Sequence, residues 1–306
     1  MFVNNRLDFG VFSSTMVSMN KITREDRCRV VSALVEGNSI RSTVRMTGVA
    51  KNTVAKLLAD LGCVCAEYQD QAFRNLTCRR IQLDEIWSFC YSKGKNVPDE
   101  RKGTFGIGDI WTLVAIDADT KLVPSWLVAT RDGDSAKAFV SDLASRLANR
   151  VQLTSDGHSA YLEAVEQAFG MNVDYAMLVK LYGSDQAPHE ARYSPANCLG
   201  CKHKPVTGHP DDNHVSTSFV ERQNLTMRMG MRRFTRLTNG FSKKVENHGH
   251  AIALHYMHYN FVRLHQTLRS TPAMRAGVAD HKWSIEEIVD LLPELKYNTR
   301  PKKVAD

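Results

Sequence analysis

The sequence predicts an α/β protein in which a mixed β-sheet with flanking helices follows a small all-α unit. Two observations predict this architecture. Residues 21–61 carry apolar side chains at helical spacing, interrupted by caps and turns. Residues 81–169 instead alternate apolar runs of strand length with helical stretches, in the order β-β-β-α-β-α. That order is typical of the ribonuclease-H-like fold.

The all-α unit reads as three short helices. Thr23 can cap the first, which ends at Gly37 and Asn38. Residues 39–47 form the second, and Gly48 begins a tight turn into a third helix. A helix, a turn that contains glycine and a helix with polar residues at its start is the helix-turn-helix pattern, so we expect a DNA-binding domain here.

The third helix of this unit would lie in the major groove of DNA with its first turn near the base edges. Lys51, Asn52 and Thr53 should therefore face outward, and Lys56 can reach a phosphate. The apolar side chains within residues 54–58 should face inward. A three-helix bundle that binds no partner is the alternative.

The second half of the chain supplies the sheet and its helices. Residues 122–129 should pair as a hairpin with the strand before them, and residues 182–213 look loop-like. A helix that begins at Asp134 or Ser135 should follow the hairpin. The other predicted elements are strands over 81–89, 110–116 and 151–155 and helices over 159–169, 218–237 and 244–268.

These elements predict how the chain divides into parts. A ribonuclease-H-like catalytic domain should contain the sheet, with one further short helix beyond it. The predicted parts are a flexible extension over 1–19, the helix-turn-helix domain over 20–65, a linker over 66–79, the catalytic domain over 80–275 and a C-terminal helix with a basic tail over 276–306.

Three acids stand out by their positions in these elements. Asp84 lies inside an apolar strand, Asp156 lies where the fourth strand ends, and Glu221 lies in the first turn of a long helix. A carboxylate in an apolar strand is costly to bury unless it binds a cation or another partner. Two magnesium ions ~3.5–4 Å apart would supply the missing counter-charge and the clamp for in-line phosphoryl transfer. The pattern therefore predicts a catalytic, metal-binding acidic triad.

Each acid also has an ordinary structural explanation. Asp84 is an acceptable charge on an edge strand, and its neighbour Glu85 shows that acids are tolerated there. Because adjacent strand residues face opposite sides, we expect only one of these two to point at the site. Asp156 suits a turn, and Glu221 suits a capping box with Ser218. Because the strands that carry Asp84 and Asp156 are expected to be neighbours, the three acids taken together favour catalysis.

Basic side chains follow Glu221 along the same predicted helix and beyond it, and they are suited to hold a DNA backbone over the metal site. A solvated helix face is the alternative. The residues are Arg228, Arg232, Arg233, Arg236, Lys243 and Lys244.

Several of these segments resemble the DDE transposases of the insertion sequence 1 family. The resemblance extends over roughly residues 80–275, and the segment around Glu221 is its most specific part. The segments are residues 83–89, 153–157, 220–228, 232–238, 241–248 and 259–268.

The resemblance implies a function. Asp84, Asp156 and Glu221 would bind Mg²⁺ or Mn²⁺, two ions in all, and the enzyme would cleave transposon ends and join the freed 3′ hydroxyl to target DNA. Double-stranded DNA and a second copy of the chain are the implied partners, because two ends must be held together. A catalytically inactive DNA-binding regulator derived from such an enzyme is the alternative, and a nuclease without strand transfer is a third.

Two features of the sequence fit the family less well. An N-terminal zinc finger, which many relatives carry, has no matching cysteine pattern here, and the stretch between Asp156 and Glu221 is long, which leaves the loop over 182–213 without an assigned role. Cys198, Cys201 and His203 have a spacing that suits zinc in part but matches no standard finger. His248, on the basic segment, is a candidate for a role near the reacting phosphate.

The composition indicates which partners and which cellular compartment suit the protein. Forty Lys and Arg against 33 Asp and Glu give a net charge of +7, which favours a polyanionic partner. No apolar run approaches the roughly 20 residues that span a bilayer, and the N-terminus does not have a signal peptide pattern. Seven scattered cysteines suit free thiols in a reducing compartment. We therefore expect a cytoplasmic, nucleoid-associated protein without membrane contact.

Overall fold

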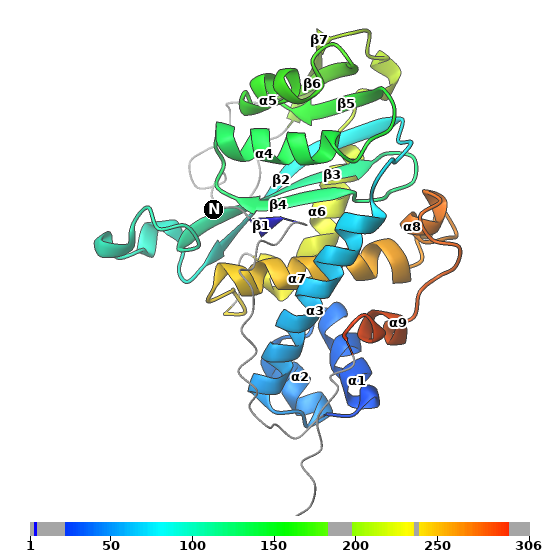
Figure 1. The fold of residues 1–306 in the computed structure, drawn as a ribbon. Helices are drawn as coiled ribbons and strands as arrows, with labels where there is room; N and C mark the ends of the chain where they lie inside the picture. Colours follow the sequence, from blue (N-terminus) through cyan, green and yellow to red (C-terminus); the bar gives the residue numbers. More distant parts are fainter. Residues whose placement is uncertain (1–2, 5–21, 183–197, 236–238, 294–306) are drawn as a thin grey trace, which may run out of the picture.

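A computed structural model describes residues 3–4, 22–182, 198–235 and 239–293 of the chain. Its centre is one seven-stranded sheet in the order β1-β4-β3-β2-β5-β6-β7 (Figure 1). The strands are β1 (Val3–Asn4), β2 (Arg80–Cys90), β3 (Gly108–Asp117), β4 (Ser125–Ala129), β5 (Val151–Asp156), β6 (Val173–Tyr182) and β7 (Cys198–Thr207).

The directions of the strands confirm the predicted fold class. Strands β4, β3 and β2 are antiparallel neighbours, β2, β5 and β6 run parallel, and β7 returns antiparallel to β6. A hairpin-connected trio followed by parallel strands is the ribonuclease-H-like arrangement. The first and fourth predicted strands, β2 and β5, are direct neighbours, as the prediction requires.

Helices cover both faces of the sheet. Helices α4 and α5 pack together on one face, and α6 lies against β2 and β3 on the other (Figure 1). The α-helices are α1 (Arg24–Val35), α2 (Ile40–Thr47), α3 (Lys51–Ala72), α4 (Gly133–Ala144), α5 (Ala160–Phe169), α6 (Ser218–Gly230), α7 (Val245–Met257), α8 (Pro272–Arg275) and α9 (Ile285–Asp290). No helix in the described ranges has the length and apolarity needed to cross a bilayer.

The three N-terminal helices form as the sequence predicts. The Thr23 side chain accepts a hydrogen bond from the Asp26 backbone and caps α1. Gly37 and Gly48 adopt φ values of 81° and 75°, the left-handed backbone that turns the chain out of α1 and α2.

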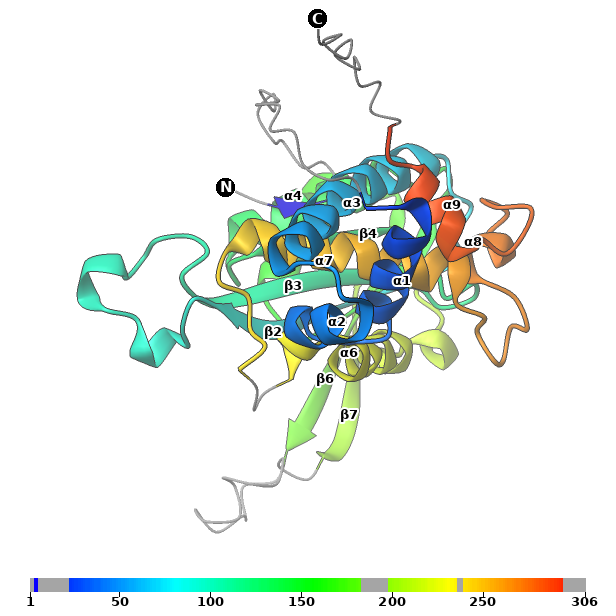
Figure 2. The same cartoon turned by 90° about the horizontal axis from the view of Figure 1, so that it is seen from below.

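Helix α3 connects this unit rigidly to the sheet domain. It continues to Ala72, so the predicted linker is helical over its first half. Where α3 crosses α7, a Cβ on Gly62 would lie 2.4 Å from the Cβ of His250 (Figure 2). Farther along, the buried Gln69 donates to the Ala253 carbonyl at 3.1 Å. The apolar residues of both parts belong to one core cluster, so the two parts pack as one body.

Several predicted boundaries are wrong, each for a local reason. The segment we expected to be a loop contains β7, whose strand hydrogen bonds come from β6 rather than from local propensity. Helix α6 ends at Gly230 instead of continuing to residue 237. Helix α7 ends at Met257 and passes into a π-helical turn, and Asp132 rather than a later residue caps α4.

Candidate metal and nucleic-acid site

Two of the three predicted acids lie side by side in the sheet. Asp84 is on β2, and Asp156 is the last residue of the neighbouring strand β5. The ladder between these strands ends at the pair Leu83 and Ser155, so both acids lie just beyond it at the same level. Asp84, Glu85 and Asp156 each place a carboxylate oxygen within 4.8 Å of the others. Within the described ranges, this is the one cluster of such side chains.

Glu85 belongs to this cluster, contrary to our expectation that only one of Asp84 and Glu85 could reach it. The two side chains do leave the strand on opposite faces, since Asp84 contacts α6 and Glu85 lies near Tyr161 of α5. However, β5 pairs with β2 only as far as Leu83, so beyond that point the sheet is open on the β5 side of β2, although β3 still pairs on the other side. The longer Glu85 side chain therefore reaches the same edge as Asp84.

Helix α6 brings the third predicted acid next to this cluster. Asn224 donates from Nδ2 to Asp84 Oδ2 at 2.9 Å. Glu221 precedes Asn224 by three residues, so it lies on the same side of the helix about 4.5 Å nearer its start. The Glu221 charge is close enough to raise the pKa of Asp84. Its carboxylate nevertheless lies outside the 4.8 Å cluster.

Two partners hold Glu221 in that position. The Thr217 hydroxyl donates to its Oε1 at 2.5 Å, and Lys180 of β6 forms an ion pair with the same oxygen. Thr217 rather than Ser218 is the N-cap of α6, without a side-chain cap bond. The capping-box explanation of Glu221 is therefore wrong.

The carboxylates of β2 repel one another in a partly dry site. Burial, with smaller contributions from Asp156 and Glu221, raises the pKa of Asp84 to about 6. Burial and the Asp156 charge raise the pKa of Glu85 to about 7, although Tyr161 and Arg131 offset part of the rise. Glu85 Oε1 is buried and has no well-formed hydrogen bond within the described part of the chain, although the Tyr161 hydroxyl lies near enough to lower the pKa of Glu85.

Arg131 supplies part of the counter-charge. Its Nη2 lies 3.4 Å from Glu85 Oε2 and 3.9 Å from Asp156 Oδ2. The guanidinium carbon lies 4.8 Å from the centre of the Trp111 ring, which fixes the side chain from the other side. Glu85 and Asp156 thus share one cation, and Asp84 has no ion pair among the described residues. The sequence had no local signal for Arg131 or Lys180, because only the fold brings them to the acids.

This donor set fits a divalent cation. Carboxylate oxygens are the ligands that Mg²⁺ and Mn²⁺ prefer. A carboxylate oxygen without a well-formed hydrogen bond and raised carboxyl pKa values indicate charge that an added cation would neutralise. Asp84, Asp156 and Glu85 have the spacing to hold such an ion, and Glu221 needs to move toward them. Asn224 is a further missed residue, which its i+3 spacing from Glu221 could have revealed.

The predicted recognition helix presents its residues as expected. At the start of α3, Lys51 and Asn52 are exposed and Thr53 is half-buried. The apolar side chains of residues 54, 57 and 58 are buried. Lys56 is exposed and forms an ion pair with Asp60 at 2.8 Å.

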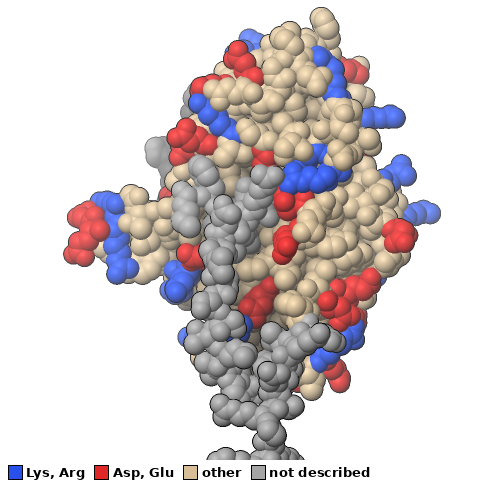
Figure 3. Space-filling model, in the orientation of Figure 1, with Lys and Arg blue, Asp and Glu red and all other residues tan. Residues whose placement is uncertain are grey.

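The basic residues after Glu221 do not form one helical stripe. Arg228 is half-buried in α6, but Arg232 and Arg233 lie in a 3-10 turn after Gly230. Lys243 and Lys244 are exposed just before α7. Arg236 lies outside the described residues. On the face drawn in Figure 3, basic and acidic side chains are interspersed, so that face is not a basic surface.

The structure also places His248 and the residues of the partial zinc motif. Both ring nitrogens of His248 contact serine hydroxyls, Ser88 at 3.1 Å and Ser242 at 2.9 Å, and burial lowers its pKa to about 3. His248 is therefore a neutral residue that joins β2 to α7, which does not support a role at a reacting phosphate. Cys201 and His203 lie on β7 and belong to no ligand cluster of the described residues. The Cys198 side chain lies outside the described part.

Comparisons with known proteins give distant structural likenesses. No protein-family model matches the chain, and no curated protein matches it. A piggyBac transposase synaptic complex with hairpin DNA aligns with 91% of this chain and 72% of that one, at 12% identity and a TM-score of 0.39. A Mos1 mariner paired-end complex with Mn aligns with 82% of each chain, at 13% identity and a TM-score of 0.22. A pre-cleavage Mos1 transpososome covers 79% of this chain and 80% of that one, at 10% identity and a TM-score of 0.21. At TM-scores this low, the strand order and register of the chain itself establish its fold.

Proposed function

We propose that this chain is a DDE transposase related to the insertion sequence 1 family. It binds transposon ends and catalyses metal-dependent strand cleavage and strand transfer. The observation that carries the proposal is the meeting of Asp84 and Asp156 at the shared edge of β2 and β5. Asn224 and Glu221 of α6 lie against the same edge. This is where a ribonuclease-H-like sheet gathers acids from strands distant in sequence.

The proposed ligands of Mg²⁺ or Mn²⁺ are Asp84, Asp156 and Glu221, and Glu85 is a fourth acid within reach. Ions held there would supply activation of the attacking oxygen and charge stabilisation for the leaving oxygen of an in-line displacement. The chain itself positions these ligands: Asn224 donates to Asp84 and fixes its carboxylate. Arg131 screens Glu85 and Asp156 from each other.

To join this cluster, Glu221 exchanges its hydrogen bond from Thr217 and its ion pair with Lys180 for the cation. The Glu221 side chain is 41% exposed and that of Lys180 is 29% exposed, so their ion pair contributes about 0–1 kcal/mol. The carboxylate of Glu221 approaches Asp84 from the turn of α6 that already contacts it through Asn224.

Double-stranded DNA is the proposed partner, as the transposon ends and as the target. We propose that Lys51 and Asn52, which are exposed at the start of α3, read the ends. Because α3 is continuous and packs on α7, an end bound there would lie at a fixed distance from the carboxylates. We propose that the protein acts as a homo-oligomer, since two ends must be processed together.

The second candidate function is a catalytically inactive, transposase-derived DNA-binding regulator. One specific observation favours it: Arg131 and Lys180 already pair with Glu85, Asp156 and Glu221, as cations that replaced a metal would do. The two functions differ in a single property, metal-dependent cleavage.

The test is cleavage of a duplex that carries the terminal repeats of the element, with and without Mg²⁺. The wild type should nick the duplex only with the metal. Asp84→Asn and Glu221→Gln should each lose cleavage and keep DNA binding. Glu166→Gln, at an exposed acid on α5, is the matched control and should cleave normally. Retained cleavage by Asp84→Asn would overturn the site, and no cleavage by the wild type would favour the regulator.

A further inference from the structure

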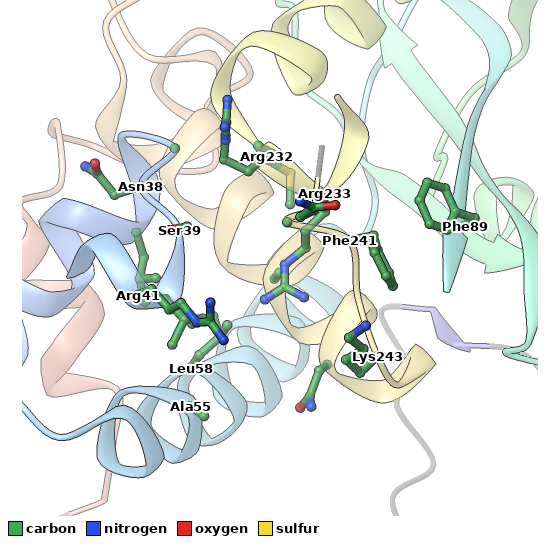
Figure 4. A pocket seen from close by; sticks show the side chains of 18 of the residues that line it. Asn38, Ser39, Arg41, Ala55, Leu58, Phe89, Arg232, Arg233, Phe241 and Lys243 are labelled. Atoms are coloured by element: carbon green, nitrogen blue, oxygen red, sulfur yellow. The ribbon is translucent and has the colours of Figure 1, made fainter. Parts of the chain in front are cut away.

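A large groove runs between the N-terminal helices and the sheet domain, away from the carboxylate cluster. Its volume is about 1500 Å³. One wall comes from the α1–α2 turn and the first turns of α2 and α3, and the other from the end of β2, the turn after α6 and the start of α7. Figure 4 shows Arg41 on the helical wall and Arg233 on the opposite wall, both directed into the groove.

The groove carries charge of one sign. Each wall contributes lysines and arginines, and no Asp or Glu is among the lining residues that the structure describes. Like charges that face one another across a groove destabilise it unless an anion lies between them. The cations include Arg41 on the helical wall and Lys93, Lys95 and Lys243 on the other.

Arg233 indicates what kind of anion the groove suits. Its Nη1 donates to the Ser242 hydroxyl at 2.7 Å, and no carboxylate of the described ranges forms an ion pair with it. Burial lowers the pKa of its guanidinium to about 10. A partly buried guanidinium without an acid is a costly arrangement that a phosphate oxygen would relieve.

The rest of the lining distinguishes an unpaired strand from a duplex. Part of the lining is apolar, with Leu34, Val35, Leu58 and Leu254, and it also includes the rings of Tyr91 and Phe241, with the buried ring of Phe89 packed against Phe241. A duplex presents phosphates and groove edges to a protein, and its base faces are stacked away. Unpaired bases have exposed faces that stack on rings and pack on apolar side chains.

The volume of the groove also suits a single DNA strand. A nucleotide of about 20 non-hydrogen atoms occupies roughly 300 Å³ at the packing density of organic crystals. The groove therefore has room for about five nucleotides of one strand. Phe89 follows Asp84 by five residues along β2, so the rings lie about 17 Å from the carboxylates. That separation corresponds to about five phosphates at duplex spacing, and fewer in an extended strand.

We propose that this groove binds an unpaired stretch of DNA strand, about five nucleotides long, with bases against the rings and the apolar lining and phosphates on the cations. The strand is the one that leads from the carboxylate cluster, and this part of the inference rests on the proposed function. The groove thus holds the DNA separated at the end being processed, while α3 holds the duplex beyond it.

The experiment measures binding of a fluorescent single-stranded hexanucleotide and of a 20-base-pair duplex by anisotropy, in EDTA. Tyr91 is the most exposed of the three rings, at 38%. Tyr91→Leu should weaken hexanucleotide binding about fivefold or more, because it removes a stacking face but keeps an apolar side chain. Tyr91→Phe should bind like the wild type. Both variants should bind the duplex normally.

The charge is tested separately. Arg232→Gln, which removes an exposed cation of the groove, should lower the salt dependence of hexanucleotide binding by about 0.7 in the slope of log K against log [salt]. Arg275→Gln, at an exposed residue of α8 outside the groove, is the matched control and should leave the slope unchanged.

The outcomes separate this inference from the proposed function. Equal losses on duplex and hexanucleotide would overturn the inference and make the groove a path for duplex phosphates. Hexanucleotide binding that stays normal in Tyr91→Leu, with an unchanged salt slope in Arg232→Gln, would overturn it as well. Because binding is measured without metal, a protein that binds the hexanucleotide as expected but cleaves no DNA would support the groove and contradict only the transposase proposal.

Discussion

The Glu85→Gln variant measures what the buried charge of Glu85 costs the stability of the folded protein, separately from the part that Glu85 plays in metal binding. The glutamate side chain is 2% exposed, and its pKa rises from 4.5 to about 7 in the folded protein. At 1.36 kcal/mol per unit, ionising Glu85 costs the metal-free fold about 3 kcal/mol. Glutamine has nearly the same shape and does not carry this charge. The variant should therefore be more stable than the wild type at pH 8, by up to about 3 kcal/mol.

The sign of the pH dependence follows from the raised pKa. Between pH 4.5 and 7 the folded protein keeps a proton on Glu85 that the unfolded chain has lost, so wild-type stability falls as the pH rises through this window. The advantage of Glu85→Gln should therefore be absent at pH 4.5 and complete above pH 7. At about 2 °C per kcal/mol for a chain of this size, the gain in Tm should reach about 5 °C.

The assay is thermal unfolding of both proteins in EDTA at several pH values, repeated with Mg²⁺. The metal should raise the Tm of the wild type at pH 8 and raise that of Glu85→Gln much less, because the variant lacks one carboxylate of the cluster. A variant that is less stable than the wild type at pH 8 in EDTA would refute the electrostatic reasoning. A full Mg²⁺ response in the variant would remove Glu85 from the metal site.

Three further predictions follow from the same structure. Mg²⁺ affinity measured by calorimetry should be about 20-fold weaker at pH 6 than at pH 8. With pKa values of about 6 for Asp84 and about 7 for Glu85, both carboxyls are ionised in only about 5% of molecules at pH 6. An affinity that does not change with pH would contradict these pKa values. Gly62→Ala should lower the Tm by several degrees, since its Cβ would meet His250 at 2.4 Å and overpacking costs about 1–3 kcal/mol, whereas Gly133→Ala, with open space around its Cβ, should not. Replacing Lys51 and Asn52 together by alanine should abolish the preference for terminal repeats over random duplex in a competition assay, and a retained preference would mean that another element reads the ends.

The sequence was sufficient for the elements whose signals are local. Periodic apolar residues and caps located the N-terminal helices, and apolar runs located β2, β3 and β5. The acid in an apolar strand marked Asp84, and the strand order placed Asp156 beside it.

The missed features depend on contacts between distant segments. Strand β7 forms because β6 offers it a ladder, although its own residues include glycine, proline and lysines. The cluster gained Glu85 because β5 ends where it does, which a rule of alternation along one strand does not take into account.

The length of α3 is a missed feature of another kind, because its signal is local. No proline interrupts the helix from Lys51 to Ala72, and buried residues recur along it at helical spacing.

The most direct test of the central claim is a crystal structure of the protein grown with Mn²⁺, with anomalous scattering used to locate the metal. The account predicts an anomalous peak within coordination distance of both Asp84 and Asp156, with Glu85 or Glu221 completing the ligands. A structure that binds no Mn²⁺ between these two aspartates, or that separates their carboxylates, would contradict it.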